Sequence, residues 1–135
     1  MRKGPVIGFL LCLCLLLAAC GQMGQSKEKI RSLEFTVLDD SAIPKELLAQ
    51  IQERKAQAFQ YVFSDRDYLY ICIGYGEQKT KGYSIVVDDL YLAEAGIYAQ
   101  TTLLGPKNAK GETKEPSYPY IVIKTEYLEQ TVVVQ

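Results

Sequence analysis

The chain has 135 residues, with 15 basic and 16 acidic side chains, so its formal net charge is −1, and it contains no histidine. The missing histidine excludes Ser–His and Cys–His catalytic pairs and most zinc sites. The basic residues form no cluster, which argues against a nucleic-acid partner.

The first twenty residues have the pattern of a secretory signal. Two basic residues precede an uncharged apolar run at residues 6–19, which is shorter than the roughly 20 residues that a membrane-spanning helix needs. The run leads into Leu17-Ala18-Ala19-Cys20, which resembles the bacterial lipobox. This resemblance implies that residues 1–19 are a cleaved lipoprotein signal peptide and that Cys20 carries the lipid. The alternatives are an ordinary secretory signal and an uncleaved anchor.

Removal of residues 1–19 would leave a mature chain of 135 − 19 = 116 residues with 13 basic and 16 acidic side chains, a net charge of −3. This length suits one domain. We expect Cys20 and a polar tether at residues 20–29, followed by a single domain at residues 30–135. Because Cys72 would be the one unmodified cysteine, no intramolecular disulfide is expected.

The first elements expected in this domain are a strand, a helix and a hairpin. Residues 30–38 alternate between apolar and polar side chains, which indicates a half-buried strand. Pro44 suits a helix start, and the apolar positions that follow have helical spacing, so a helix is expected over residues 44–57. Two aromatic-rich runs, 59–63 and 68–73, flank a short polar turn and indicate a β-hairpin.

The remaining sequence also predicts strands. They are expected at residues 83–87 with a continuation at 90–92, and Asp88-Asp89 between them indicates a bulge. A turn at residues 94–96 leads to a strand at 97–104, then a loop to residue 119, a strand at 120–124 and a last one at 131–134. The predicted fold class is α+β: a mainly antiparallel β-sheet with one amphipathic helix packed on it.

No catalytic, metal or cofactor site is expected. Cys72 lies between two isoleucines in an apolar strand, whereas a nucleophilic thiol needs an accessible, electropositive setting. The Asp pairs at 39–40, 65 and 67, and 88–89 fall at expected turns, where Asp bonds nearby backbone N–H groups. Calcium at Asp65-Arg66-Asp67 is disfavoured by the intervening arginine.

The segment between the strands that end at Ile73 and begin at Tyr83 is the candidate binding site. Its glycines permit close backbone approach or positive φ, its lysines place positive charge on an acidic protein, and its tyrosines suit an interface. A hairpin loop without a partner is the alternative interpretation. The candidate partner-binding residues are Gly76, Glu77, Gln78, Lys79, Thr80, Lys81, Gly82 and Tyr83.

Two stretches of the sequence carry a family resemblance. A Tyr-Leu-Tyr strand precedes Gly-x-x-x-Thr-x-Gly-Tyr-Ser-Ile at residues 76–85, and Pro-Ser-Tyr-Pro-Tyr-Ile-Val-Ile follows at 116–123. Over roughly residues 45–125 the chain resembles the C-terminal domain of the PrcB family of protease complex subunits. The resemblance implies a signature loop at Gly76–Tyr83 and a second signature at Tyr118, Pro119 and Tyr120.

The PrcB resemblance implies a non-catalytic lipoprotein that binds and stabilises an extracytoplasmic, subtilisin-like protease. Its expected location is the cell membrane or outer membrane of a bacterium, held there by lipid. One alternative is a protease inhibitor, because Thr80–Tyr83 is weakly similar to the Thr-Gly-Tyr loops of chagasin-like inhibitors. Another is a cell-envelope or carbohydrate-binding module with tyrosine stacking platforms. An enzyme with Cys72 as nucleophile is the least favoured.

Overall fold

The computed structural model describes residues 27–107 and 114–135. The predicted signal peptide, Cys20 and most of the predicted tether lie outside these residues. The described part contains eight β-strands, one α-helix and one short 3-10 helix. Their bounds are β1 Lys29–Ser32, β2 Phe35–Val37, η2 Asp40–Ala42, α2 Lys45–Arg54, β3 Ala58–Ser64, β4 Tyr68–Tyr75, β5 Ser84–Ala93, β6 Gly96–Leu104, β7 Tyr120–Glu126 and β8 Val132–Val134.

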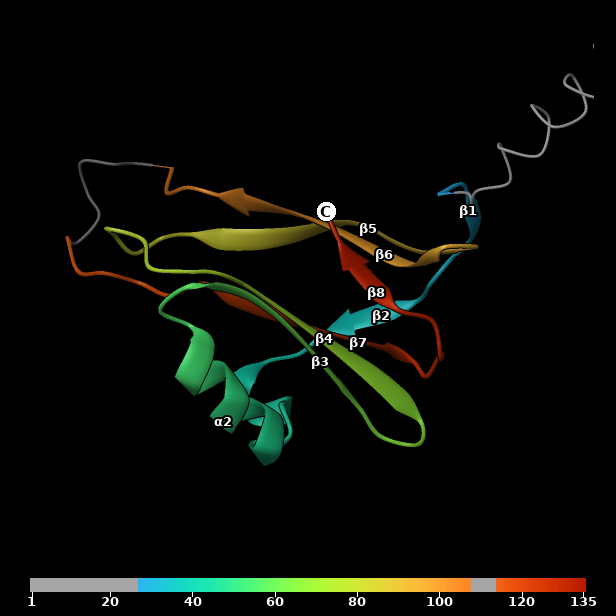
Figure 1. Ribbon diagram of the computed structural model, residues 1–135. Helices are drawn as coiled ribbons and strands as arrows, with labels where there is room; N and C mark the ends of the chain where they lie inside the picture. The colour runs from blue at the N-terminus through green and yellow to red at the C-terminus, as the bar shows by residue number, and fades with distance from the viewer. Residues whose placement is uncertain (1–26, 108–113) are drawn as a thin grey trace, which may run out of the picture.

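The strands form two layers, with the helix below the second (Figure 1). Sheet A has the strand order β1-β5-β6-β8, and sheet B has the order β2-β7-β4-β3. All pairs are antiparallel except β6 with β8, which is parallel. The α+β class with mainly antiparallel pairing and one helix is confirmed, but the chain builds two sheets where one was expected.

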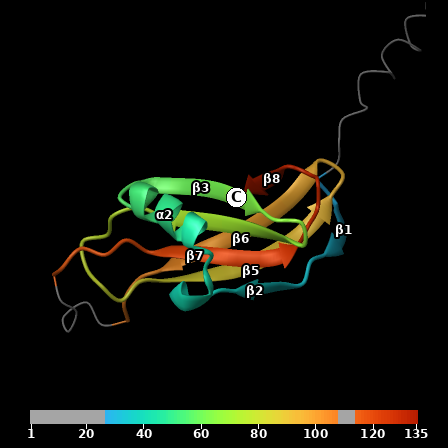
Figure 2. The same ribbon diagram turned by 90° about the horizontal axis from the view of Figure 1, so that it is seen from below.

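The core lies between the two sheets, and a second cluster lies between sheet B and the helix. Ile71 and Ile123 face sheet A, whereas Cys72 and Val122 face Leu47 and Ile51 of α2. Seen from below, α2 lies across sheet B (Figure 2). Because β4 is covered on both faces, its residues Leu69–Gly74 are all buried, which explains a continuous apolar run in place of alternation.

The prediction for residues 30–38 was wrong in part. This segment is two short strands, and it changes sheets between them: β1 pairs with β5 in sheet A, and β2 pairs with β7 in sheet B. Leu33 at the change is buried, but Phe35 and Val37 are 40% and 48% exposed. Alternating apolar residues show that a segment is extended, but they do not show to which sheet each half belongs.

The predicted helix was too long at both ends. It runs over Lys45–Arg54, with Pro44 as the residue before it. Ala58, the residue after the predicted helix, is an exposed residue at the start of β3. The chain must leave the helix before β3 because the 58–64 segment pairs with β4 along its whole length.

The hairpin and the bulge follow the predictions. β3 and β4 pair without interruption, from Ala58 opposite Tyr75 to Ser64 opposite Leu69. In the turn, the carboxylate of Asp65 accepts hydrogen bonds from the N–H groups of Asp67 and Tyr68. The β5–β6 register shifts between Val87 and Asp89, where the paired aspartates predicted a bulge. The strand at 83 begins one residue later, at Ser84.

Candidate functional site

The two predicted signature segments meet at one end of the domain. Gln78 and Ser117 exchange both backbone hydrogen bonds, Gln78 N to Ser117 O at 2.8 Å and Ser117 N to Gln78 O at 3.0 Å. The Ser117 hydroxyl donates to the carbonyl of Thr80 at 2.6 Å, and the Tyr75 N–H donates to the carbonyl of Pro119 at 3.1 Å. The loop is therefore tied along its length to the segment that precedes β7.

Side chains add a second set of contacts between the same segments. The ammonium of Lys81 lies 2.8 Å from a carboxylate oxygen of Glu115, which raises the pKa of Lys81 and lowers that of Glu115 through a hydrogen bond and charge attraction. The Tyr118 hydroxyl donates to Glu77 at 3.4 Å. Lys55 lies over the Tyr118 ring, 5.4 Å from its centroid, and this contact adds the end of the helix to the cluster.

Gly76 and Gly82 have positive φ angles of 78° and 94°, in the region that favours glycine. At Gly76 a Cβ atom would also lie 2.9 Å from the backbone nitrogen of Ala58. The glycine therefore permits the loop to pass directly beside the connection from α2 to β3. This gives Gly76 a structural role, while Gly82 is exposed.

The other predicted residues divide into exposed and packed groups. Glu77, Lys79 and Lys81 are exposed, and Gln78, Thr80, Tyr83, Tyr118 and Pro119 are half-buried. Tyr120 lies apart from the loop: it belongs to the cluster under α2, and its hydroxyl donates to Asp40 at 2.8 Å. Burial, with that hydrogen bond and the Asp40 charge, raises the pKa of Tyr120 to about 12.

Three contributors were missed by the sequence reasoning. Ser117, Glu115 and Lys55 all contact the signature residues. Ser117 lies in the second quoted stretch, so its proximity to the second signature was a usable signal. No sequence pattern around Lys55 indicated its contact with Tyr118, because that contact depends on where α2 ends.

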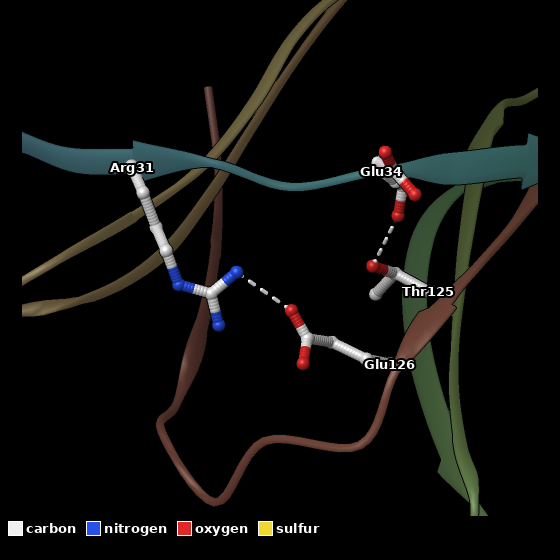
Figure 3. Close-up of polar contacts among 4 residues, drawn as sticks. All are labelled: Arg31, Glu34, Thr125 and Glu126. Atoms are coloured by element: carbon white, nitrogen blue, oxygen red, sulfur yellow. Dashed lines mark hydrogen bonds and ion pairs between the residues drawn. The ribbon is translucent and has the colours of Figure 1, made fainter.

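A separate open groove of about 1150 Å³ lies where the chain changes sheets. Figure 3 shows its polar contacts: Arg31 forms an ion pair with Glu126 at 2.7 Å, and the Thr125 hydroxyl donates to the carbonyl of Glu34 at 2.7 Å. These contacts hold β1 and the two residues that join it to β2 against the end of β7. The lining residues come from β1, β2 and the residues that join and follow them, from the β3–β4 turn with the first residue of β4, and from β7. The signature residues are not among them.

The buried thiol has the properties of a packed residue. Cys72 has no exposed surface, and burial raises its pKa to about 12, opposite to the direction that activates a thiol. Asp65 has a lowered pKa because its carboxylate accepts two backbone N–H groups of its turn. Among the described residues, no three His, Cys, Asp or Glu side chains are grouped as metal ligands.

No helix within residues 27–107 and 114–135 is long and apolar enough to span a membrane. The fold and the end cluster together define a small two-sheet α+β domain whose two signature segments form one surface. We call this surface the signature end: residues 76–83 and 115–119, with Lys55.

Comparison with known proteins supplies the family. Residues 69–126 match the model of the PrcB C-terminal family, which confirms the resemblance read from the sequence. The match includes both signature segments but begins at β4, so α2 and β3, which the resemblance was expected to include, lie outside it. No curated protein matches the chain, and no solved structure does.

Proposed function

We propose that this chain is a non-catalytic, lipid-anchored subunit that binds a subtilisin-like protease outside the cytoplasm and stabilises or localises it. The observation that carries the proposal is the joining of the two PrcB signature segments into one surface through Gln78 and Ser117. These residues are 117 − 78 = 39 positions apart, and their backbone pairing places the exposed Lys79 and Lys81 of one segment beside Glu115 of the other.

The position of this surface supports a role in binding at a distance from a membrane. β1, which follows the predicted tether, lies at one end of the domain, and the signature end lies at the other (Figures 1 and 2). β5 joins the two ends with ten residues, about 33 Å of extended chain. A domain held by lipid at Cys20 would therefore present its signature end away from the bilayer.

The charge of the signature end indicates the kind of partner surface. Lys55, Lys79 and Lys81 outweigh Glu77 and Glu115 by 3 − 2 = +1, and the flanking Lys107 and Lys114 raise this to +3. The described residues as a whole carry 12 basic and 15 acidic side chains, a net charge of −3. Since complementary charge directs association, an acidic surface on the protease would fit this end.

The proposed anchor and the proposed contact are tested by separate variants. Cys20→Ala should leave the precursor unprocessed or release the protein from the membrane; a membrane-bound, normally processed variant contradicts the lipoprotein assignment. Crosslinked wild-type protein should copurify with a secreted protease from its own membranes. Lys79→Glu should reduce that recovery, and Lys45→Glu, the same change at an exposed helix residue, should not.

Two further experiments test the alternatives. Titration of the purified protein against a panel of proteases would reveal an inhibitor by loss of protease activity at micromolar concentration. A pull-down on isolated cell wall would reveal an envelope-binding module. The proposed function expects neither result, and a positive cell-wall pull-down without any protease in the crosslinked material would replace it.

A further inference from the structure

The four edge strands of the two sheets differ in how well they are protected from pairing with another chain. β2 and β8 have three residues each, and β1 has four, with a register shift and two charged side chains. β3 has seven residues, Ala58–Ser64, paired with β4 without a register shift. It contains no charged side chain and no proline, two of the devices that usually protect an edge.

The outward-facing backbone of β3 can be assigned from the turn. Asp65 N donates to Tyr68 O at 3.1 Å, and antiparallel pairs alternate between bonded and non-bonded. The backbone groups of Phe59, Tyr61 and Phe63 therefore face β4. The open edge, beside which the described residues place no strand, is faced by the backbone groups of Ala58, Gln60, Val62 and Ser64.

The sequence of β3 is self-complementary about Tyr61. A second β3 strand running antiparallel, with Tyr61 opposite Tyr61, places each Phe59 opposite Phe63 and each Gln60 opposite Val62. The aromatic side chains of both strands then lie on the face that carries α2, and aromatic pairs directly opposite one another stabilise a sheet. Val62, which is 44% exposed, becomes covered.

The same register satisfies the backbone. With Tyr61 at the centre, the four outward-facing residues of one strand lie opposite those of the other. Each contributes one N–H and one C=O, which gives about eight hydrogen bonds across the pair. Tyr61 itself forms a non-bonded pair with its counterpart, the arrangement in which opposite Cα atoms are closest, at about 4.5 Å.

Charges at the two ends of β3 are complementary in this arrangement. Arg54 and Lys55 precede the strand, and Asp65, Arg66 and Asp67 follow it. Glu53, which forms an ion pair with Arg54, reduces the net charge of the first end to +1, so antiparallel pairing brings an end with charge +1 of one copy beside the end with charge −1 of the other. Both such contacts form, because a two-fold interface uses the same surface twice.

We propose that the open edge of β3 binds a second copy of this chain. The two copies pair antiparallel about Tyr61 and join their B sheets into one sheet of 4 + 4 = 8 strands, with both α2 helices on the same face. The self-complementary aromatic order and the opposite charges at the strand ends select a second copy over an unrelated strand. The dimer shares only Lys55 with the signature end, and residues 76–83 and 115–119 take no part in the strand pairing, so the protease contact proposed at Lys79 is tested separately.

A disulfide trap tests the register in the full-length protein in its own membrane. Tyr61→Cys places two thiols within the Cα separation of about 4.4–6.8 Å that a disulfide bridges. Under mild oxidation it should give a covalent dimer on a non-reducing gel. Val37→Cys, on the other edge strand of the same sheet, and the wild type should not.

A second variant tests the proposal without altering the aromatic face. Sedimentation of the purified mature protein should show a concentration-dependent dimer, which Val62→Lys abolishes and Val37→Lys leaves unchanged. A monomer at several hundred micromolar, together with no Tyr61→Cys dimer, would overturn the proposal. A Tyr61→Cys adduct with a different protein would also overturn it, because another partner would then occupy the edge.

Discussion

Replacement of Gly76 by alanine should destabilise the domain more than the same replacement at Gly82. Both residues have positive φ, which costs a residue with a Cβ atom about 1–2 kcal/mol. Only at Gly76 would the new atom lie 2.9 Å from the Ala58 nitrogen, an overpacked contact that adds about 1–3 kcal/mol. In both variants the lower entropy of the unfolded chain offsets about 0.4–1 kcal/mol of this loss in stability.

The expected net losses are therefore about 1–4.6 kcal/mol for Gly76→Ala, centred near 3, and about 0–1.6 kcal/mol for Gly82→Ala, centred near 1. Urea unfolding of the mature chain, followed by far-UV circular dichroism, measures both. Asparagine, which tolerates positive φ, should recover most of the loss at Gly82 but not at Gly76. Equal losses at the two positions would refute the structural role assigned to Gly76.

Three further predictions concern Cys72, Asp65 and Tyr120. Iodoacetamide should modify Cys72 only after urea unfolding, because the thiol is buried and its pKa is raised to about 12; rapid modification of the native protein contradicts this packing. The pKa of Asp65 is lowered in the folded state, so its stabilisation is present above pH ~4 and is lost as pH falls through the folded value. Asp65→Asn should therefore flatten the acid limb of the stability curve, and an unchanged limb would contradict the turn contacts. Tyr120→Phe should reduce the free energy of unfolding in urea by about 1 kcal/mol, because it removes the hydrogen bond to Asp40, and no loss would show that this bond contributes nothing.

The local elements were predictable because their signals are local. The aromatic-rich runs at residues 59–63 and 68–73 with the polar turn between them indicated the hairpin, and the Asp88-Asp89 pair indicated the bulge in β5. The division of residues 29–37 between two sheets was not predictable, since the sheet that each half joins depends on β5 and β7, far along the chain. The same limit applies to β8, whose valines indicate a strand but not its parallel pairing with β6.

The candidate site was predictable as two segments, but not as one surface. The glycines and lysines of residues 76–83 marked the loop, and the Pro-Ser-Tyr-Pro stretch marked the second segment. Their contact through Gln78 and Ser117 depends on the return of the chain from β6 to β7. Tyr120, assigned to the second signature, faces the helix instead, because side chains alternate along the strand that begins with it.

The central claim is that the signature end contacts a protease outside the cytoplasm. The most direct measurement is site-specific photocrosslinking of the protein in the cells that produce it, with the photoreactive residue at position 79 or at position 45 and the products identified by mass spectrometry. The account predicts an extracytoplasmic protease crosslinked from position 79 and absent from position 45. The same products from both positions, or no protease from position 79, would contradict it.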